Sequence, residues 1–326
     1  MKRREFIALF AGAAALPFTA RAQSSIPVIG YLGSETPELF TSRLDAFRQG
    51  LAATSFVEGK NVAIEYRWAQ GRNDRLPTLA AELVSANVSV LSTPGSLASA
   101  LAAKAATSTI PIVFETGAEP VAAGLVASLN KPGGKITGIT SLNAQVGPKR
   151  LESLYELLPS ATAFALLINP TNPRNADATT NSMQAAARAL KLQLHVLQAS
   201  HEDEFDGVFV KARNLAAAGL VIANETYFAI RSDALGRLAQ RYAMPAAHQS
   251  REFALADGLM SYGGDVMESH RQAGIYTGRV LKGENPADLP VQQVTKVRMV
   301  INLKAAKALG INVPLPLLGR ADEVIE

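Results

Sequence analysis

The stretch Ile26-Pro-Val-Ile-Gly-Tyr-Leu-Gly-Ser-Glu-Thr36 decides the fold, because it joins a short β-branched run to a polar turn. Residues 28–32 predict a buried strand, and residues 43–53 predict a helix whose apolar stripe includes Leu44 and Phe47. A buried strand followed by an amphipathic helix is the repeating unit of a parallel sheet covered by helices. The sequence therefore predicts an α/β protein.

The same unit recurs along the chain in two series. In the first series, further strands are predicted at residues 62–68, 89–91, 110–114 and 136–140, with helices at 76–85, 97–106 and 121–129. In the second series, strands are predicted at residues 164–168, 192–197, 220–223 and 244–247, with helices at 183–190, 205–217 and 233–242. Each series needs about 80 residues from its first strand to its fourth, as two copies of one supersecondary unit should.

A chain of this length normally forms two cores rather than one. We therefore expect two similar doubly wound parallel-sheet lobes instead of a single long sheet. The C-terminal part of the chain adds strands at 259–262 and 297–301 and helices at 266–281 and 303–309. If the helix at 266–281 returns to the first lobe and the last strand to the second, the chain crosses between the lobes three times and forms a three-strand hinge. The predicted N-terminal lobe comprises residues 26–140 plus 261–295, and the predicted C-terminal lobe comprises residues 141–260 plus 296–326.

Residues 1–22 predict an export signal peptide. Lys2-Arg-Arg4 is basic, residues 7–18 are apolar but too few to span a bilayer, and Ala20-Arg-Ala22 offers small residues to a signal peptidase. We expect cleavage after Ala22 and a periplasmic protein. The Arg3-Arg4 pair is typical of the twin-arginine route, but a Sec signal can also carry two arginines, so both routes stay open.

Charge and cysteine content restrict the partners. The formal net charge of +4 would suggest a polyanion, but the signal holds four of the 32 basic residues and one of the 28 acidic residues. The remainder carries 28 basic and 27 acidic groups, so neither nucleic acid nor an anionic membrane is expected as a partner. Because the sequence has no Cys, we expect no lipid anchor after the signal and no disulfides.

Ligands of an open parallel sheet bind beyond the carboxyl ends of the strands, where helix N-termini present free N–H groups. That rule selects four short polar loops in each half of the chain, and two such sets facing each other would enclose a small polar ligand. The predicted ligand-binding residues, from these loops and the strand at 259–262, are Ser34, Trp68, Gly95, Ser96, Glu115, Thr116, Gly117, Asn169, Thr171, Asn224, Glu225, Tyr227, His248, Gln249 and Tyr262.

Each type of side chain in these loops also has a purely structural interpretation. Gly95 lets the backbone approach a ligand, and Ser96 either binds a carboxylate or simply caps the next helix. The carboxylates that could bind a ligand ammonium, or instead be solvated, are Glu115, Glu119 and Glu225. The aromatic side chains that could stack on a ligand, or instead pack in the core, are Trp68, Tyr227, Phe228 and Tyr262.

Catalytic and metal-binding signatures are missing from the sequence. It has no G-x-G-x-x-G after a strand, no G-x-x-x-x-G-K-[ST] and no H-E-x-x-H. Ser261 lacks the first glycine of a G-x-S-x-G elbow, and His195 and His201 lie in a strand and at a helix start. His248 is expected to be a binding group. We therefore expect no enzyme activity, no cofactor and no metal site.

Several segments together resemble the ABC-transporter substrate-binding family of the type I periplasmic binding protein fold. These segments are Ile26-Pro-Val-Ile-Gly-Tyr-Leu, Gly59-Lys-Asn-Val-Ala-Ile-Glu-Tyr-Arg-Trp, Ile110-Pro-Ile-Val-Phe, Asn130-Lys-Pro-Gly-Gly, Leu259-Met-Ser-Tyr-Gly and Ala321-Asp-Glu-Val-Ile-Glu. Members of this family are often described as tryptophan or aromatic amino-acid binders. The resemblance implies a receptor, expected to be a monomer, that closes on a small-molecule ligand and delivers it to a membrane permease and ATPase.

The resemblance also suggests roles for individual residues. In amino-acid binders of this fold, Ser and Thr loops of the first lobe hold the ligand carboxylate, and these would be Ser96 and Thr116 here. An acidic residue of the other lobe holds the ammonium, and Glu225 is the candidate. Many relatives have Asp in place of Glu119 and a different polar pattern around Glu225, which affects the identity of the ligand rather than the architecture.

Two other functions remain as alternatives. A periplasmic sensing module would present its closed state to a membrane receptor, and a neighbouring kinase gene rather than permease and ATPase genes would indicate it. A periplasmic enzyme is less favoured, given the missing signatures. A DNA-binding regulator of the same fold would carry a helix-turn-helix before Ile26, where this chain has the predicted export signal.

Overall fold

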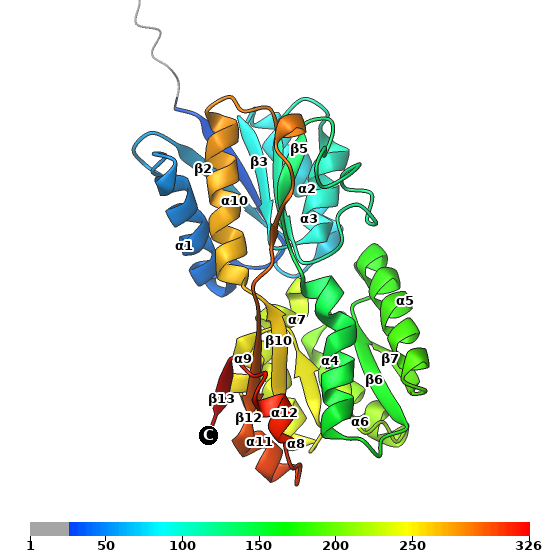
Figure 1. Ribbon diagram of the computed structural model, residues 1–326. Helices are drawn as coiled ribbons and strands as arrows, with labels where there is room; N and C mark the ends of the chain where they lie inside the picture. Colours follow the sequence, from blue (N-terminus) through cyan, green and yellow to red (C-terminus); the bar gives the residue numbers. More distant parts are fainter. Residues whose placement is uncertain (1–25) are drawn as a thin grey trace, which may run out of the picture.

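The computed structural model describes residues 26–326, which form two lobes joined end to end (Figure 1). The predicted signal peptide, residues 1–22, lies outside the described residues. Within residues 26–326, no helix is long and apolar enough to cross a membrane.

The first lobe is built on a six-stranded sheet in which every neighbouring pair is parallel. Its strands are β1 (Val28–Gly33), β2 (Ala63–Trp68), β3 (Val90–Pro94), β4 (Ile112–Thr116), β5 (Ile136–Ser141) and β11 (Gln292–Val294), in the order β11-β5-β4-β3-β1-β2. Its helices are α1 (Pro37–Ala53), α2 (Leu76–Ser85), α3 (Leu97–Ala106) and α10 (Val266–Leu281), with short 3₁₀ turns η1 (Asn73–Arg75) and η3 (Pro286–Asp288).

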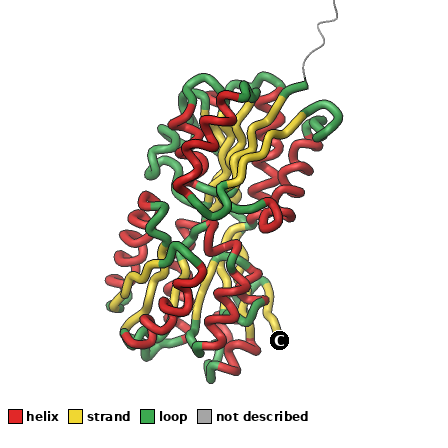
Figure 2. Tube along the Cα trace, turned by 180° about the vertical axis from the view of Figure 1, so that it is seen from behind, coloured by secondary structure: helices red, strands yellow, loops and turns green. Residues whose placement is uncertain are grey.

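Helices cover both faces of this sheet, as Figure 2 shows from behind. Alternate residues of β1 point to opposite faces, so Ile29 and Tyr31 pack against α1 and α10 while Leu32 packs against α2 and α3. Each face thus has its own hydrophobic core, which explains why the strand reads as a nearly continuous apolar run.

The second lobe repeats this plan with a seven-stranded sheet. Its strands are β6 (Ala163–Ile168), β7 (Gln193–Gln198), β8 (Leu220–Ile222), β9 (Ala246–His248), β10 (Met260–Gly264), β12 (Val297–Asn302) and β13 (Glu323–Ile325), in the order β13-β12-β10-β9-β8-β6-β7. Only the β10–β12 pair is antiparallel among these described strands. Its helices are α4 (Asn143–Leu157), α5 (Pro173–Ala189), η2 (Glu202–Glu204), α6 (Phe205–Asn214), α7 (Thr226–Ile230), α8 (Ser232–Arg241), α9 (Arg251–Leu255), α11 (Leu303–Ala308) and α12 (Leu315–Leu318).

The chain passes between the lobes three times: from β5 to α4, from β10 to α10, and from β11 to β12. The second passage differs from the predicted boundary at residue 261, which falls inside β10. Ser261 pairs with His248 of β9, and the antiparallel pairing with β12 continues to Gly264. Residues 261–264 therefore belong to the second sheet, and the chain enters the first lobe after them.

One predicted helix is absent from the described structure, and one long helix of the structure was not predicted. The helix predicted at residues 121–129 is a series of turns, because Gly124 adopts a left-handed φ of +69° and the N–H groups of Leu125 and Val126 both donate to the Pro120 carbonyl. In contrast, α4 was not predicted, since Gly147 and Pro148 interrupt its apolar pattern near the start.

Helix α10 packs closely against α1 at glycine residues. A helix from late in the sequence thereby completes the first lobe (Figure 1). A Cβ on Gly274 would lie 2.0 Å from the Phe47 carbonyl oxygen, and one on Gly50 would lie 1.9 Å from the Arg271 carbonyl oxygen. The two backbones therefore touch, and no larger residue fits either position without moving a helix. This contact positions the N-terminus of α10 at the junction of the lobes.

We predict that Gly274→Val separates α1 from α10 and destabilises the protein by about 3 kcal/mol, the upper range for overpacked cores. Thermal or urea unfolding would measure this loss. The matched control is Gly207→Val: Gly207 lies in α6, a Cβ there would meet no atom within 4 Å, and its φ lies outside the left-handed region. A Gly274→Val protein as stable as this control would contradict the packing argument.

Candidate functional site

The carboxyl ends of the parallel strands in both sheets point toward the junction of the lobes, and the polar loops that follow them meet there. A small space of about 40 Å³, here called the inner cavity, lies between these loops and the first two passages of the chain. A larger space of about 540 Å³, the outer cavity, adjoins it. Arg43, Ala229, Gln249 and Val266 line both cavities.

The structure brings seven of the predicted site residues to the wall of the inner cavity. They come from the carboxyl ends of β3, β4, β8 and β9 or the loops that follow them, and are Gly95, Glu115, Thr116, Gly117, Asn224, Glu225 and Gln249. Both lobes contribute, as the rule of strand ends implies. Thr116 accepts a hydrogen bond from the Ala118 N–H at 3.1 Å, which leaves the hydroxyl proton available to a ligand.

Four other predicted ligands, Ser34, Ser96, Asn169 and Thr171, lie outside both cavities. Ser96 is buried and caps α3 by accepting from the Ser99 N–H at 3.3 Å, which is the structural alternative considered for it. Asn169 accepts from the N–H and hydroxyl of Thr171, and the Thr171 hydroxyl accepts from Asn73 of the first lobe at 3.1 Å. Ser34 is buried beside these loops, away from the cavity walls.

The predicted aromatic and histidine ligands also lie outside both cavities. Trp68 stacks on Tyr66 and covers Gly33, Tyr227 packs among Phe205 and Phe228, and Tyr262 packs against the core of the second lobe. His248 is fully buried, and burial holds the pKa of its imidazole well below the usual value. A role of these four residues in ligand binding stays a prediction.

Other residues of the inner cavity were not predicted, because most of them come from helices rather than strand ends. They include Arg43 of α1, Asn143 of α4, Asn172 and Asn175 at the start of α5, and His270 of α10. One signal was available for Arg43, which stands four residues before Phe47 and three after Phe40 and so lies on the buried stripe of α1. A charge in an apolar stripe often marks a binding site.

Glu225 is the most strongly held acid of the cavity. Its Oε2 accepts from Asn172 Nδ2 at 3.0 Å and from Asn175 Nδ2 at 2.9 Å. The residue is 6% exposed, and burial raises the pKa of its carboxyl to about 7 even though the two amides stabilise the ionised form.

Glu115 is the corresponding acid of the first lobe. It is 4% exposed, and burial raises the pKa of its carboxyl to about 7, while the Arg43 guanidinium works in the opposite direction. Two acids with raised pKa values thus line one small space from opposite lobes, and both would be stabilised in the ionised form by a cation placed between them.

His270 and Gln249 add two further acceptors. His270 Nδ1 lies 2.9 Å from the Val266 carbonyl oxygen, which can only accept, so this assignment puts the ring proton on Nδ1 and a lone pair on Nε2. Burial lowers the pKa of His270 to about 3, so the ring is neutral. Among residues 26–326, neither His270 Nε2 nor Gln249 Oε1 has a hydrogen-bond partner, although both are buried. The inner cavity is therefore rich in acceptors.

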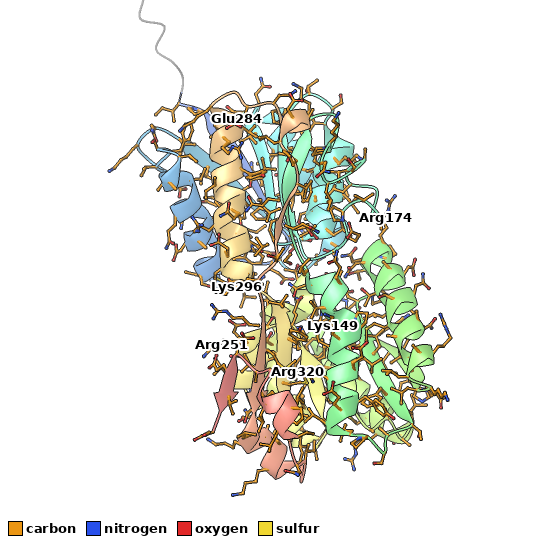
Figure 3. The ribbon with its side chains drawn as sticks, viewed as in Figure 1. Lys149, Arg174, Arg251, Glu284, Lys296 and Arg320 are labelled. Atoms are coloured by element: carbon orange, nitrogen blue, oxygen red, sulfur yellow. The ribbon has the colours of Figure 1, made fainter. Side chains whose placement is uncertain are left out.

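Direct contacts hold the two lobes together around the cavity. Asn224 Nδ2 donates to the Gly117 carbonyl at 2.8 Å, and the Thr226 hydroxyl donates to the Gly95 carbonyl. Arg174, at the start of α5, donates to the Ala123 carbonyl of the first lobe at 2.7 Å (Figure 3). These bonds make the arrangement of the lobes a closed one.

An ion pair also joins the two lobes. Arg231 of the second lobe lies 3.0 Å from Oε2 of Glu35, which is 2% exposed, and the guanidinium stacks on the Tyr227 ring at 3.7 Å from its centroid. The predicted aromatic residue Tyr227 thus supports an interlobe contact.

Asn143 connects the cavity to two passages of the hinge. Its Nδ2 donates to the Ser141 hydroxyl at 3.1 Å, and its Oδ1 accepts from the Gly264 N–H at 2.7 Å. Its carbonyl accepts from Arg150, which is 1% exposed. A ligand that contacts Asn143 would therefore touch the point where the lobes are joined.

Within the described part of the chain, no group of three or more His, Asp or Glu side chains could hold a metal ion.

Known proteins resemble the chain over most of its length. A tyrosine-binding protein of Clostridioides difficile strain R20291 is 26% identical over 278 residues, which cover 81% of this chain and 75% of that protein. The ABC domain from Streptococcus pneumonia in complex with L-Trp superposes with a TM-score of 0.82 at 22% identity, covering 92% of this chain and 100% of that one.

The chain also resembles a second solved structure. The ligand-free, open structure of a substrate-binding protein with adhesive properties from Clostridium difficile superposes with a TM-score of 0.62, again at 22% identity, covering 92% of this chain and 99% of that one. The two solved structures agree with this chain in fold, that of the type I periplasmic binding proteins. Residues 35–325 match the family described as ABC transporter substrate binding protein, and the chain belongs to this family.

Proposed function

We propose that the protein is an exported receptor that closes its two lobes on a small ligand bearing a protonated amine and a carboxylate, such as an amino acid, and delivers it to an ABC importer. The observation that carries this proposal is the acceptor-rich inner cavity, with Glu115 and Glu225 facing it from opposite lobes. An ammonium group has three donors and a positive charge, which match these acceptors.

The known relatives support the ligand class. One is a tyrosine-binding protein and another was solved with L-Trp, so amino acids are bound by proteins of similar sequence or fold. The carboxylate is the second half of such a ligand. Thr116 remains the predicted donor to it, whereas the Ser96 hydroxyl already serves the N-terminus of α3.

Closure would follow from contacts to both lobes. A ligand that touches Glu115 and Glu225 interacts better with the closed arrangement than with an open one and shifts the population toward it. The higher TM-score against the L-Trp complex than against the ligand-free open relative is consistent with this motion. A permease and an ATPase are the expected partners of the closed form.

Glu225→Gln should weaken amino-acid binding about 30-fold, because it removes the charge opposite the ammonium while keeping its shape. Calorimetry with the twenty proteinogenic L-amino acids would first identify the ligand and then compare the variants. Glu152→Gln, at an exposed position of α4, is the control and should bind normally. Small-angle scattering should show a smaller radius of gyration with ligand, and an unchanged radius would contradict closure.

Affinity should rise with pH between about 5 and 8. An ammonium requires ionised carboxylates, and burial raises the pKa of Glu115 and of Glu225 to about 7, so binding below that pH must displace protons. Calorimetry across this range should give up to about a tenfold change per pH unit for each proton released. The Glu115→Gln, Glu225→Gln double variant should lose the dependence, and an affinity of the native protein that is flat with pH would contradict it.

Stability of the ligand-free protein should show the opposite trend. Because both pKa values are higher in the folded state than in the unfolded chain, their stabilising contribution is complete below about pH 4.5 and is lost as the pH rises through about 7. Thermal unfolding should therefore begin at a lower temperature at pH 8 than at pH 5, with a smaller difference in the double variant.

Export is proposed from residues 1–22. Mass spectrometry of the N-terminus of the protein recovered from periplasm should show a chain that begins at Gln23. Replacing Arg3 and Arg4 by lysine should block export on the twin-arginine route and leave a Sec signal working. Recovery of the uncleaved chain from the cytoplasm of the native host would contradict export by either route.

A further inference from the structure

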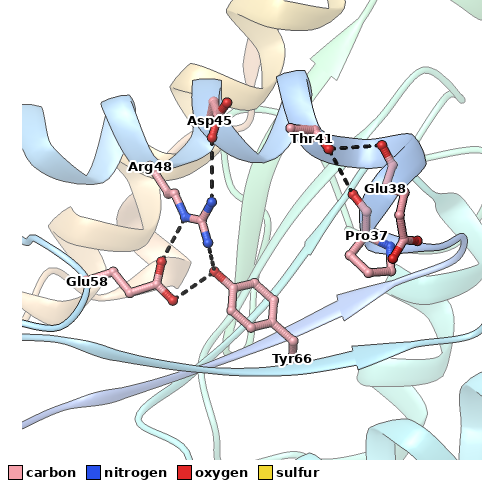
Figure 4. A network of polar contacts seen from close by, with 7 residues as sticks. All are labelled: Pro37, Glu38, Thr41, Asp45, Arg48, Glu58 and Tyr66. Carbon is pink, nitrogen blue, oxygen red and sulfur yellow. Dashed lines mark hydrogen bonds and ion pairs between the residues drawn. The ribbon is translucent and has the colours of Figure 1, made fainter.

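Two arginines of α1 lie in opposite situations. Arg48 is fully engaged: its Nε lies 2.7 Å from Glu58, a second nitrogen donates to the Tyr66 hydroxyl at 3.1 Å, and Asp45 lies at 3.5 Å (Figure 4). Arg43, from the same helix, is partly buried and lines both cavities. Its guanidinium rests on the Phe40 ring, 5.2 Å from the centroid.

Arg43 has no acidic partner at ion-pair distance. None of the ion pairs within 4.0 Å among residues 26–326 includes it, and neither does any hydrogen bond between their side chains. Of the nearby acids of the first lobe, Glu115 lies beyond ion-pair distance, and Glu35 is already paired with Arg231 at 3.0 Å. A guanidinium remains charged under all physiological conditions and presents a fork of N–H donors, so it is suited to bind a carboxylate.

The inner cavity is too small for a whole amino acid. Its volume of about 40 Å³ compares with about 10–15 Å³ for one water molecule on the same measure, so it has room for an ammonium group but not for a whole amino acid. The rest of a ligand must therefore extend into the outer cavity, whose volume is about 540 Å³. Arg43 stands at the wall that the two cavities share.

The lining of the outer cavity combines polar and aliphatic side chains. Its polar groups include Ser42, Ser250, Ser261, Asp233 and Arg298. Among the described residues, no aromatic side chain lines it, and the aromatic residues predicted to stack on a ligand are packed elsewhere. Aromatic ligands gain much of their affinity from aromatic faces, which this wall does not offer.

We propose that Arg43 binds the carboxylate of an amino acid whose ammonium occupies the inner cavity, and that the outer cavity accepts a polar, non-aromatic side chain. This inference rests on the proposed function. It adds the residue that binds the ligand carboxylate and the chemical class of the ligand side chain. Because ammonium and carboxylate are attached to one carbon in an α-amino acid, their binding sites must be neighbours, as Glu115 and Arg43 are. The carboxylate then turns toward α1 instead of toward Ser96, the position suggested by the resemblance.

The test compares an amino acid with the amine obtained by removing its carboxylate. Calorimetry would use L-glutamine with 4-aminobutanamide, L-arginine with agmatine, and L-serine with ethanolamine. The native protein should prefer the best-bound amino acid over its amine by about 100-fold or more, and Arg43→Met should reduce this preference to below about tenfold. Arg43→Lys should restore part of it, since an ammonium supplies charge without the fork.

Arg48→Met is the matched control on the same helix. It removes the contacts with Glu58 and Tyr66, so it should lower the unfolding temperature while leaving the preference for the amino acid unchanged. Circular dichroism would establish that the Arg43 variants are folded. If Arg43→Met does not fold, the comparison with the native protein is made with Arg43→Lys.

The possible results distinguish a failure of the role given to Arg43 from a failure of the proposed function. An Arg43→Met protein that prefers the amino acid as strongly as the native protein would overturn the anchor and leave the proposed function intact. L-tryptophan or L-tyrosine as the tightest ligand of all twenty amino acids would overturn the polar side-chain compartment. Binding of none of these probes would overturn the proposed function, and the inference with it.

Discussion

The burial of two carboxylates at the junction of the lobes is the constraint on which the rest of the structure depends. Removing a charged group from water is costly unless a partner compensates for it. Asn172 and Asn175 compensate only part of this cost for Glu225, and Arg43 compensates only part of it for Glu115, since the pKa of each carboxyl is raised to about 7. A bound cation would supply the remainder, which links closure of the lobes to the presence of a ligand.

The fold delivers these groups to one place from distant parts of the sequence. Strand ends of two separate sheets supply Glu115 and Glu225, while α10 brings His270 back to the first lobe after β6 to β10 of the second lobe. The close contact at Gly50 and Gly274 fixes that helix, and Asn143 bonds to both Ser141 and Gly264 in the hinge. The site is thus anchored on rigid elements, and its two halves are joined through hinge segments.

The sequence was sufficient to predict much of this arrangement. Hydrophobic periodicity gives the order of most strands and helices, and the rule that ligands bind at strand ends selects seven of the residues that line the inner cavity. The pattern fails where local backbone features interrupt it: Gly147 and Pro148 lie inside α4, and turns around Gly124 replace the helix predicted at residues 121–129.

The rest of the site could not be predicted because it depends on which surfaces meet. Arg43 and His270 reach the cavity from helix sides, whose direction is set only when α1 packs on α10. Likewise, Trp68 and Tyr227 lie near strand ends as predicted, but their rings do not face the cavity. The Trp68 ring packs over Gly33, and the Tyr227 ring packs against the Arg231 guanidinium. A strand-end rule locates the loop and leaves the direction of each side chain undecided.

The most direct measurement is a high-resolution crystal structure of the protein with its tightest-binding amino acid. The account predicts the ligand nitrogen within hydrogen-bond distance of both Glu115 and Glu225, with its carboxylate on Arg43 and the lobes in the contacts described above. A ligand bound with its carboxylate against the Glu115 and Glu225 side, or bound outside the junction of the lobes, would contradict it.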